Sequence, residues 1–432
     1  MLVWARLAGC LVIGYLCMKR SFAYLGVPPL FIGEVLLAAF LLLKPRVALG
    51  SLAASLLRTS PLNALGLALL VFVLYGVWQV GRGVLSGTPL VYTLKYFVFN
   101  YYTLYMFLGM WIALHAPDSL PRLVRAIAWV NGIYGLMYIV ALRHVDITLP
   151  GSGIPLFSPA GGGAVAILGL LCFERDLRAV WPILVLNIMV TLAWQVRAEW
   201  LGLGLGIFAW GLLTGRLGRV VAIGMAGLAV LGMIELAGIR LVGHTGGGLS
   251  LSETLARAVA PIDLELAKEL SPNAVHHAGT AEWRWKWWEQ IWISTHSTPM
   301  LAAFGHGYGF DLFGLAPEEV RAGQADDIRT PHSVFYYALG YTGWVGVTLF
   351  VLLQLVVLRL LWRSFRISGQ PAGVVWWVMG MAMASFEEGF ETPYKAIPFY
   401  LLMGMAMAPA LQARRAPDRP AAAARLRPLG AR

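Results

Sequence analysis

The chain has 432 residues, of which 59% are hydrophobic and only 13% are charged, and its mean hydropathy is +0.70. A water-soluble globule of this composition would expose far too much apolar surface, so a soluble enzyme, a disordered chain and a secreted disulfide scaffold are excluded. The three cysteines lie inside apolar runs, where we expect them to pack as small hydrophobic side chains. The sequence therefore predicts an all-α, polytopic membrane protein.

Apolar runs divide the chain into candidate membrane spans, since a helix needs about 20 mostly apolar residues to cross a bilayer. We predict a region of nine spans over residues 1–238, a long outer loop over 239–331, three more spans over 332–412 and a basic, disordered tail over 413–432. The twelve candidate runs lie near residues 2–18, 25–43, 62–80, 91–114, 121–142, 154–173, 180–196, 199–214, 219–238, 333–358, 371–386 and 396–412.

The distribution of positive charge predicts the orientation of these spans. With the N-terminus in the cytoplasm, 19 of the 33 Lys and Arg residues fall on the cytoplasmic side and 14 on the outer side. Cytoplasmic loops are the ones enriched in Lys and Arg, so both termini are predicted to be cytoplasmic. The formal net charge of +11 is then a topology signal and an attraction to anionic membrane lipid, and no nucleic-acid partner is needed to explain it.

Charged residues inside or beside a span are costly, and each is a candidate functional residue. Glu34 interrupts a nearly all-apolar span and must face the bundle interior, with Arg82 and Lys95 as candidate partners. A polar outer turn lies between the last two spans, and it has no role that the sequence alone assigns. This turn contains Glu387, Glu388, Glu391 and Lys395.

Arg197 lies between the seventh and eighth spans, at the predicted outer face. The planar guanidinium group can bind a phosphate through two hydrogen bonds, which makes Arg197 a candidate phosphate ligand. The alternative is an ion pair with a nearby carboxylate. Glu199 is only two residues away and would not share a helix face with Arg197, so a simple local pair is disfavoured.

The outer loop combines a predicted amphipathic helix over Ser252–Leu270 with a tryptophan-dense helix over Ala281–Ile293. The tryptophans either anchor the second helix at the membrane interface or form a platform for sugar rings or a lipid carrier. Arg284 lies among them, where it either packs against the aromatic rings or binds a second phosphate oxygen. The five tryptophans are Trp283, Trp285, Trp287, Trp288 and Trp292.

His332 follows Pro331 directly, at the point where the outer loop becomes the tenth span. An imidazole is the side chain best suited to accept a proton near neutral pH, although a single histidine is also common as a structural residue. Asp326 and Asp327 precede His332, but their spacing is not that of a metal site. We therefore predict no metal and no other cofactor.

The order of these residues resembles the O-antigen ligase and O-antigen polymerase superfamily of membrane glycosyltransferases of the GT-C type. Arg197 corresponds to the family's arginine at the outer end of a middle span, and Arg284 to Trp288 corresponds to its Arg-x-x-x-Trp element. The Gly-x-Gly-x-Gly-like turn at 305–309 and the His-Ser pattern that begins at His332 follow in the family's order. The chain departs from the family pattern at Ser333, Tyr336 and Tyr341.

The resemblance implies an O-antigen ligase in the bacterial inner membrane, with its active site facing the periplasm. It would move a glycan from undecaprenyl pyrophosphate to a sugar hydroxyl of lipid A–core, with inversion and without a metal. His332 would be the catalytic base, and Arg197 and Arg284 would bind the pyrophosphate. Trp288, Arg82 and Glu199 are expected to line the substrate. The alternatives are a polymerase that uses a second lipid-linked repeat unit as acceptor and, from another class, a lipid-linked glycan transporter.

Overall fold

The computed structural model describes residues 2–27, 30–45, 61–150, 153–194, 196–236, 238, 251–260, 263–271, 274–318, 321 and 330–415. The described chain is mostly helical, as the composition predicts, and its cysteines are unpaired. The helices outside the outer loop are α1 (Leu2–Ala23), α2 (Ile32–Leu43), α4 (Pro61–Leu85), α5 (Leu90–Tyr101), α6 (Tyr105–His115), α7 (Ser119–Val140), α8 (Gly163–Phe173), α9 (Trp181–Trp194), α10 (Arg197–Thr214), α11 (Leu217–Leu236), α17 (Val334–Ser368), α18 (Ala372–Phe386), α19 (Pro393–Ala406) and α20 (Ala408–Arg415).

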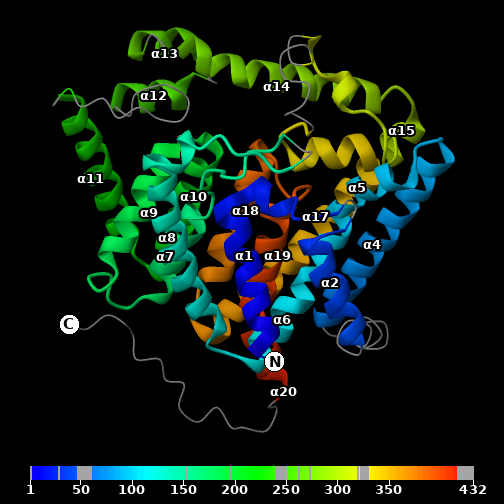
Figure 1. Ribbon diagram of the computed structural model, residues 1–432, viewed down its shortest axis with the longest axis horizontal. Coiled ribbons are helices and arrows are strands. Elements are labelled where there is room, and N and C mark those ends of the chain that lie inside the picture. The colour runs from blue at the N-terminus through cyan, green and yellow to red at the C-terminus, as the bar shows by residue number, and fades with distance from the viewer. Residues whose placement is uncertain are drawn as a thin grey trace.

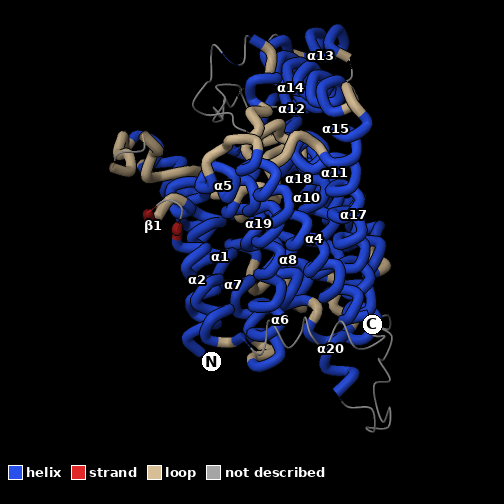
Figure 2. Tube along the Cα trace, turned by 90° about the vertical axis from the view of Figure 1, so that its right-hand side faces the viewer, coloured by secondary structure: helices blue, strands red, loops and turns tan. Residues whose placement is uncertain are grey.

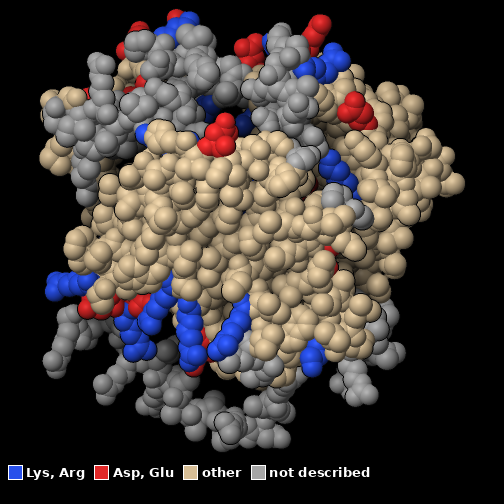
Figure 3. All heavy atoms as spheres, in the orientation of Figure 1, with Lys and Arg blue, Asp and Glu red and all other residues tan. Residues whose placement is uncertain are grey.

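Four helical stretches of the described chain are long and apolar enough to cross a membrane. They are Ala64–Leu85, Leu90–His115, Ser119–Val140 and Val334–Ser368. On the face shown in Figure 3, a broad band of residues other than Lys, Arg, Asp and Glu crosses the middle of the molecule, with Lys and Arg gathered along its lower edge. Each of the twelve predicted ranges contains helix, but the number of membrane crossings stays a prediction.

The helices of the outer loop lie together across one end of the bundle (Figure 1). The first turn of α1 and the helix α20 lie at the opposite end in both views (Figures 1 and 2). The bundle therefore has one end that carries the loop helices and another where the described chain begins and finishes. The loop helices are α12 (Leu251–Val259), α13 (Leu264–Leu270), α14 (Ala274–Thr295) and α15 (Pro299–Phe304).

Several predicted helix boundaries are wrong, and two of them have a clear local cause. The amphipathic stretch 252–270 is divided into α12 and α13, because the carboxylate of Asp263 accepts hydrogen bonds from the N–H groups of Glu265 and Leu266 and caps a new helix. The second span begins at Ile32, because Gly26–Val27 and Leu30–Phe31 pair as a short antiparallel hairpin, β1 and β2. Asp326, Asp327 and the tail from residue 416 lie outside the described residues.

The packing centre of the bundle is the contact between α6 and α19. A Cβ atom on Gly109 would lie 2.1 Å from the carbonyl oxygen of Leu401, and one on Gly404 would lie 2.2 Å from that of Met106. Only glycine permits this distance between helix backbones, as in many membrane helix pairs. The helices α10 and α18 also pack together, as do α17 and α4, and these contacts place the outer ends of α10, α17, α18 and α19 near one another.

Candidate active site

His332 lies at the end of the bundle that carries the loop helices. It follows Pro331 and comes two residues before the start of α17. The indole Nε1 of Trp288 donates a hydrogen bond to the carbonyl oxygen of Pro331 at 2.6 Å, and the Trp288 ring stacks on Tyr336 with a centroid distance of 4.9 Å. Trp283 makes an edge contact with the imidazole at 5.6 Å. Helix α14 thus holds the chain on both sides of His332.

The imidazole of His332 has a ring nitrogen that is not engaged by any described residue. This nitrogen, Nδ1, is buried and has no hydrogen-bond partner in the described part of the chain. Burial lowers the pKa of His332 to about 4, and the neighbouring Glu388 carboxylate opposes this shift. The side chain is therefore neutral at neutral pH, which is the state that a general base needs.

Arg284 lies close to His332, on the same helix as Trp283 and Trp288. Its Nη1 donates to the carbonyl oxygen of Phe386 at 3.0 Å, and its guanidinium lies over the Trp283 ring at 5.3 Å. The Nε–H is buried without a hydrogen-bond partner among the described residues, which leaves one donor of the guanidinium for a ligand. Arg284 therefore packs against an aromatic ring, and its binding of a phosphate stays a prediction.

The polar turn between α18 and α19, to which the sequence assigned no role, faces these two residues. Lys395 and Glu387 form an ion pair at 2.7 Å, and the hydroxyl of Tyr394 donates a hydrogen bond to Glu388. The carboxylates of Glu387 and Glu388 both act electrostatically on His332 and Arg284. We call the carboxylates of Glu387 and Glu388 the acidic wall of the candidate site.

Glu391 is the most deeply buried acid of this turn, with 7% of its surface exposed. No side chain of the described residues donates a hydrogen bond to its carboxylate, and the backbone groups of Gly389 and Glu391 offset its burial only in part. Burial raises the pKa of Glu391 to about 7, with a further contribution from the negative charge of Glu388. Glu391 is thus partly protonated near neutral pH.

Arg197 and Glu199 lie in the first turn of α10, which packs on α18. Arg197 is half-buried, whereas Glu199 is almost fully buried and forms an ion pair with Lys19 at 3.4 Å. Lys19 acts electrostatically on Glu387, and Glu387 acts on Glu199, which links this pair to the acidic wall. The sequence missed Lys19, because its position at the end of the first span made it look like an ordinary flanking charge.

Arg82 has a different set of contacts from the one expected of a substrate-lining residue. Its guanidinium donates to the carbonyl oxygens of Phe304 at 2.7 Å and Gly305 at 3.0 Å, and to Gln79 at 3.0 Å. Gly305 has a φ of +66°, and its backbone packs directly against the break in α17 at Gly343. Arg82 therefore fixes the glycine-rich turn to α4, and a role in lining substrate stays a prediction.

The expected pairing of Glu34 with Arg82 is wrong. The Glu34 carboxylate accepts hydrogen bonds from the hydroxyl groups of Tyr101, at 2.9 Å, and Tyr102. These tyrosines lie on α5 and at the start of the following 3₁₀ turn, η1 (Tyr102–Leu104), and not at the outer end of the bundle. Both hydroxyl groups donate to the same carboxylate oxygen, Oε1, and the other oxygen, Oε2, has no hydrogen-bond partner among the described residues.

The tryptophan cluster is divided between two faces of α14. Trp287 and Trp288 are buried and donate to backbone carbonyl oxygens of Leu312 and Pro331, so they attach the helix to the rest of the protein. Trp285 and Trp292 are 58% and 45% exposed. The exposed pair is compatible with both predictions for the tryptophans, an anchor at the membrane interface and a platform for sugar rings or a lipid carrier.

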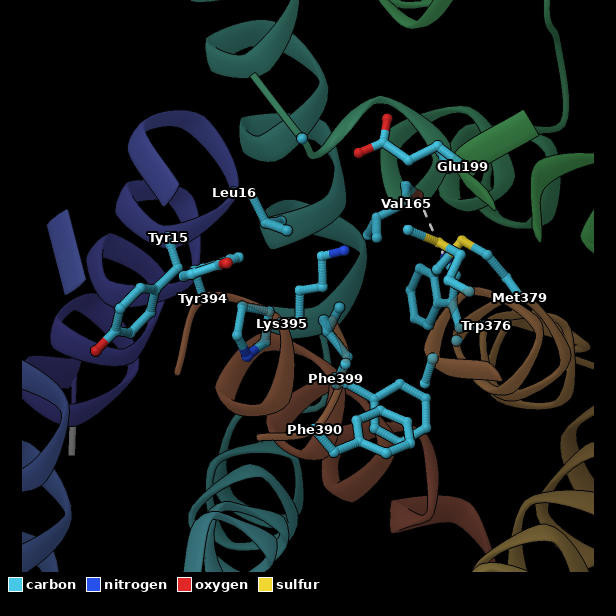
Figure 4. Close-up of a pocket in the computed structure, with 18 of the residues that line it drawn as sticks. Tyr15, Leu16, Val165, Glu199, Trp376, Met379, Phe390, Tyr394, Lys395 and Phe399 are labelled. Carbon is cyan, nitrogen blue, oxygen red and sulfur yellow. Dashed lines mark hydrogen bonds between the residues drawn. The ribbon is translucent and has the colours of Figure 1, made fainter. Parts of the chain in front are cut away.

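A cavity begins beside the charged cluster and extends between α1, α8, α10, α18 and α19. Glu199 and Lys395 lie on opposite sides of the cavity, and Lys395 points toward Glu199 (Figure 4). Aromatic rings, among them Trp376, Phe390 and Phe399, line its deeper part. The cavity thus joins a charged end to an apolar interior.

No protein-family model matches the chain, and no curated protein matches it. Among the residues that the structure describes, no three His, Cys, Asp or Glu side chains are grouped so that they could hold a metal ion.

Proposed function

We propose that the protein is a membrane glycosyltransferase that moves a glycan from undecaprenyl pyrophosphate to a sugar hydroxyl of lipid A–core, as an O-antigen ligase does. The observation that carries this proposal is the buried imidazole of His332, with an unpartnered Nδ1, beside the guanidinium of Arg284. A neutral base next to a cation is the arrangement that transfer from an anionic leaving group requires.

In the proposed reaction, the acceptor hydroxyl attacks the anomeric carbon of the donor sugar. His332 takes the hydroxyl proton as the new C–O bond forms and the bond to the pyrophosphate oxygen breaks. A direct displacement of this kind inverts the anomeric centre. Undecaprenyl pyrophosphate leaves with the bonding electron pair, and Arg197 and Arg284 stabilise the charge that develops on it.

The chemistry of the site supports transfer without a metal. The pyrophosphate is already a good leaving group, and guanidinium groups in a partly dry cavity can supply the positive charge that a divalent ion supplies elsewhere. We expect activity to survive a chelator. Loss of activity that a divalent ion restores would contradict this mechanism.

The proposed setting is the bacterial inner membrane, with both termini in the cytoplasm and the loop helices in the periplasm. A polymerase would use the same residues, and it would take a second lipid-linked repeat unit as acceptor. A lipid-linked glycan transporter is the third candidate. It is disfavoured because the charges gather at one end of the bundle, whereas transporters tend to place binding sites at mid-membrane.

The test is an acceptor experiment with purified protein. Lipid-linked glycan is supplied with lipid A–core or without it, and the products are separated by size. Glycan attached to the core supports the ligase, longer lipid-linked chains support the polymerase, and no product in either reaction contradicts both. His332→Ala should abolish transfer while the protein still accumulates in the membrane, whereas His144→Ala, at an exposed histidine away from the cluster, should be fully active.

A further inference from the structure

Two residues other than glycine have a positive φ in the described chain. They are His332, with a φ of +52°, and Lys19, with a φ of +45°. Such a conformation is costly for a residue with a Cβ atom, and it persists where the surroundings enforce it, often at functional sites. Both residues lie at the same charged cluster, because Lys19 and His332 both act electrostatically on Glu387. The proposed mechanism uses His332 and leaves Lys19 without a role.

The backbone at Lys19 interrupts α1 and directs the side chain into the bundle. The ammonium group lies over the ring of Trp194 at 5.4 Å and reaches Glu199 of α10. Gly161 leaves the space for this side chain, since a Cβ atom there would lie 2.1 Å from Cε of Lys19. The local structure is therefore built around the lysine side chain.

The ion pair between Lys19 and Glu199 is long. Its 3.4 Å distance exceeds the roughly 2.7–2.9 Å of a strong charge-assisted hydrogen bond. The neighbouring pair of Lys395 and Glu387 has a distance of 2.7 Å. Lys19 is thus the less tightly held of the two ammonium groups, and an anionic ligand with a shorter contact can compete with Glu199 for it.

Lys19 also lines the cavity between α1, α8, α10, α18 and α19. Glu199, Tyr394 and Lys395 are the other polar side chains of its charged end, and the remaining lining is almost entirely apolar. Figure 4 shows Lys395 and Glu199 near each other, with the aromatic rings of Phe390 and Phe399 farther along the cavity. A ligand that fits both parts has an anionic group attached to a hydrocarbon chain.

We propose that this cavity holds the first isoprenoid units of a polyprenyl phosphate, and that Lys19 exchanges Glu199 for the phosphate group. An isoprenoid chain matches the apolar walls, and the phosphate matches the two ammonium groups at the end of the cavity. The proposal deepens the proposed function by assigning the lipid part of its donor to this cavity. It also stands without that function, because it concerns binding alone.

Binding is measured by native mass spectrometry on the full chain in neutral detergent, with undecaprenyl phosphate as the probe. Lys19→Met keeps much of the length of the side chain without its charge and should weaken retention about tenfold or more, since a hydrogen bond to a charged group contributes roughly 1.5–3 kcal/mol. Lys19→Arg should retain the lipid. Lys44→Met, at the opposite end of the bundle, is the matched control and should bind as the unchanged protein does.

Glu199→Gln gives the sharpest discrimination. If the carboxylate competes with the phosphate for Lys19, its removal tightens binding of undecaprenyl phosphate, whereas a purely structural ion pair predicts weaker or unchanged binding. Undecaprenol, which lacks the phosphate, should bind weakly and equally to Lys19→Met and the unchanged protein. Unchanged retention of undecaprenyl phosphate by Lys19→Met would overturn the proposal.

Two further ligands distinguish the source of the phosphate. Inorganic pyrophosphate tests the head group alone, and equal affinity for it would overturn the assignment of the hydrocarbon chain. Phosphatidylglycerol tests an ordinary anionic lipid, and equal Lys19-dependent retention would overturn the isoprenoid assignment. Lys19-dependent binding by a protein that transfers no glycan would refute the proposed function and leave this inference standing. Glycan transfer by a protein that binds undecaprenyl phosphate equally well with and without Lys19 would support the proposed function and overturn this inference.

Discussion

Trp288 holds Pro331 through a hydrogen bond of 2.6 Å from its indole Nε1 to the carbonyl oxygen. This bond ties the outer helix α14 to the residue that precedes His332, whose backbone has a positive φ. The position of the imidazole thus depends on an aromatic residue from a distant part of the chain. Each residue of the site can be tested separately, because the contacts of each differ.

Trp288→Phe removes the indole donor and keeps an aromatic ring to stack on Tyr336. We expect turnover to fall about tenfold or more, because small displacements of a catalytic group are costly, while the protein still folds. The measurement is kcat for glycan transfer. Trp181→Phe, at an exposed ring at the start of α9, is the matched control and should leave kcat unchanged. Equal kcat values for the two variants would contradict a positioning role.

Arg197→Lys and Arg284→Lys test the two proposed pyrophosphate ligands. Lysine keeps the positive charge and loses the planar fork, so we expect each change to lower kcat/KM by about a hundredfold. Arg122→Lys is the control, since the side chain of Arg122 is 78% exposed at the other end of the bundle. Full activity of either variant would assign that arginine a structural role.

The pH dependence of transfer tests the state of His332. Its pKa of about 4 keeps the imidazole neutral through most of the acidic range, and protonation would remove the base as the pH falls. The acid limb of kcat/KM should therefore bend well below pH 6.5, the ordinary value for histidine. A bend near pH 6.5 would contradict this prediction and would show that the imidazole is more accessible to water than its burial indicates.

Glu391→Gln tests the cost of a buried carboxylate. The folded-state pKa of about 7 lies above the ordinary glutamate pKa of 4.5, so folding disfavours the charged form. Stability is then highest below pH 4.5 and falls as the pH rises toward 7 and beyond, by at most about 3 kcal/mol. We expect the variant to unfold at a higher temperature than the unchanged protein at pH 8, and at a similar temperature near pH 4. A uniform decrease at all pH values would contradict this.

Arg82→Ala separates a structural role from a role in substrate binding. The change removes hydrogen bonds to Phe304 and Gly305, and we expect the free energy of unfolding to fall by about 1.5–3 kcal/mol. The measurement is the unfolding temperature in detergent, with Arg143→Ala at an exposed arginine as control. A loss of activity with an unchanged unfolding temperature would instead support contact with substrate.

The helices could be predicted from the sequence because apolar runs are long and regular. Interruptions within a predicted helix could not be predicted. The change of direction at Lys19 and the division of α12 from α13 depend on single residues and their partners. Arg284 could be singled out from the sequence as a costly charge, and His332 could be singled out as a proton acceptor. The acidic wall could not, because Glu387 and Lys395 carry no spacing that reveals what they face.

The partners of Glu34 could not be predicted from the sequence either. A carboxylate in an apolar span predicts a polar partner, and the sequence offered Arg82 and Lys95 because they are charged. The actual partners, Tyr101 and Tyr102, are aromatic residues in another apolar run, where nothing distinguishes a tyrosine that donates a hydrogen bond from one that only packs.

Arg82 and Trp288 both hold the outer segment by main-chain carbonyl oxygens, those of Phe304, Gly305 and Pro331. Every residue type carries such an oxygen. The side chains at Phe304 and in the exposed parts of the segment can therefore change during evolution while these two attachments persist. A protein built in this way can vary the surface of its loop helices and keep the position of His332.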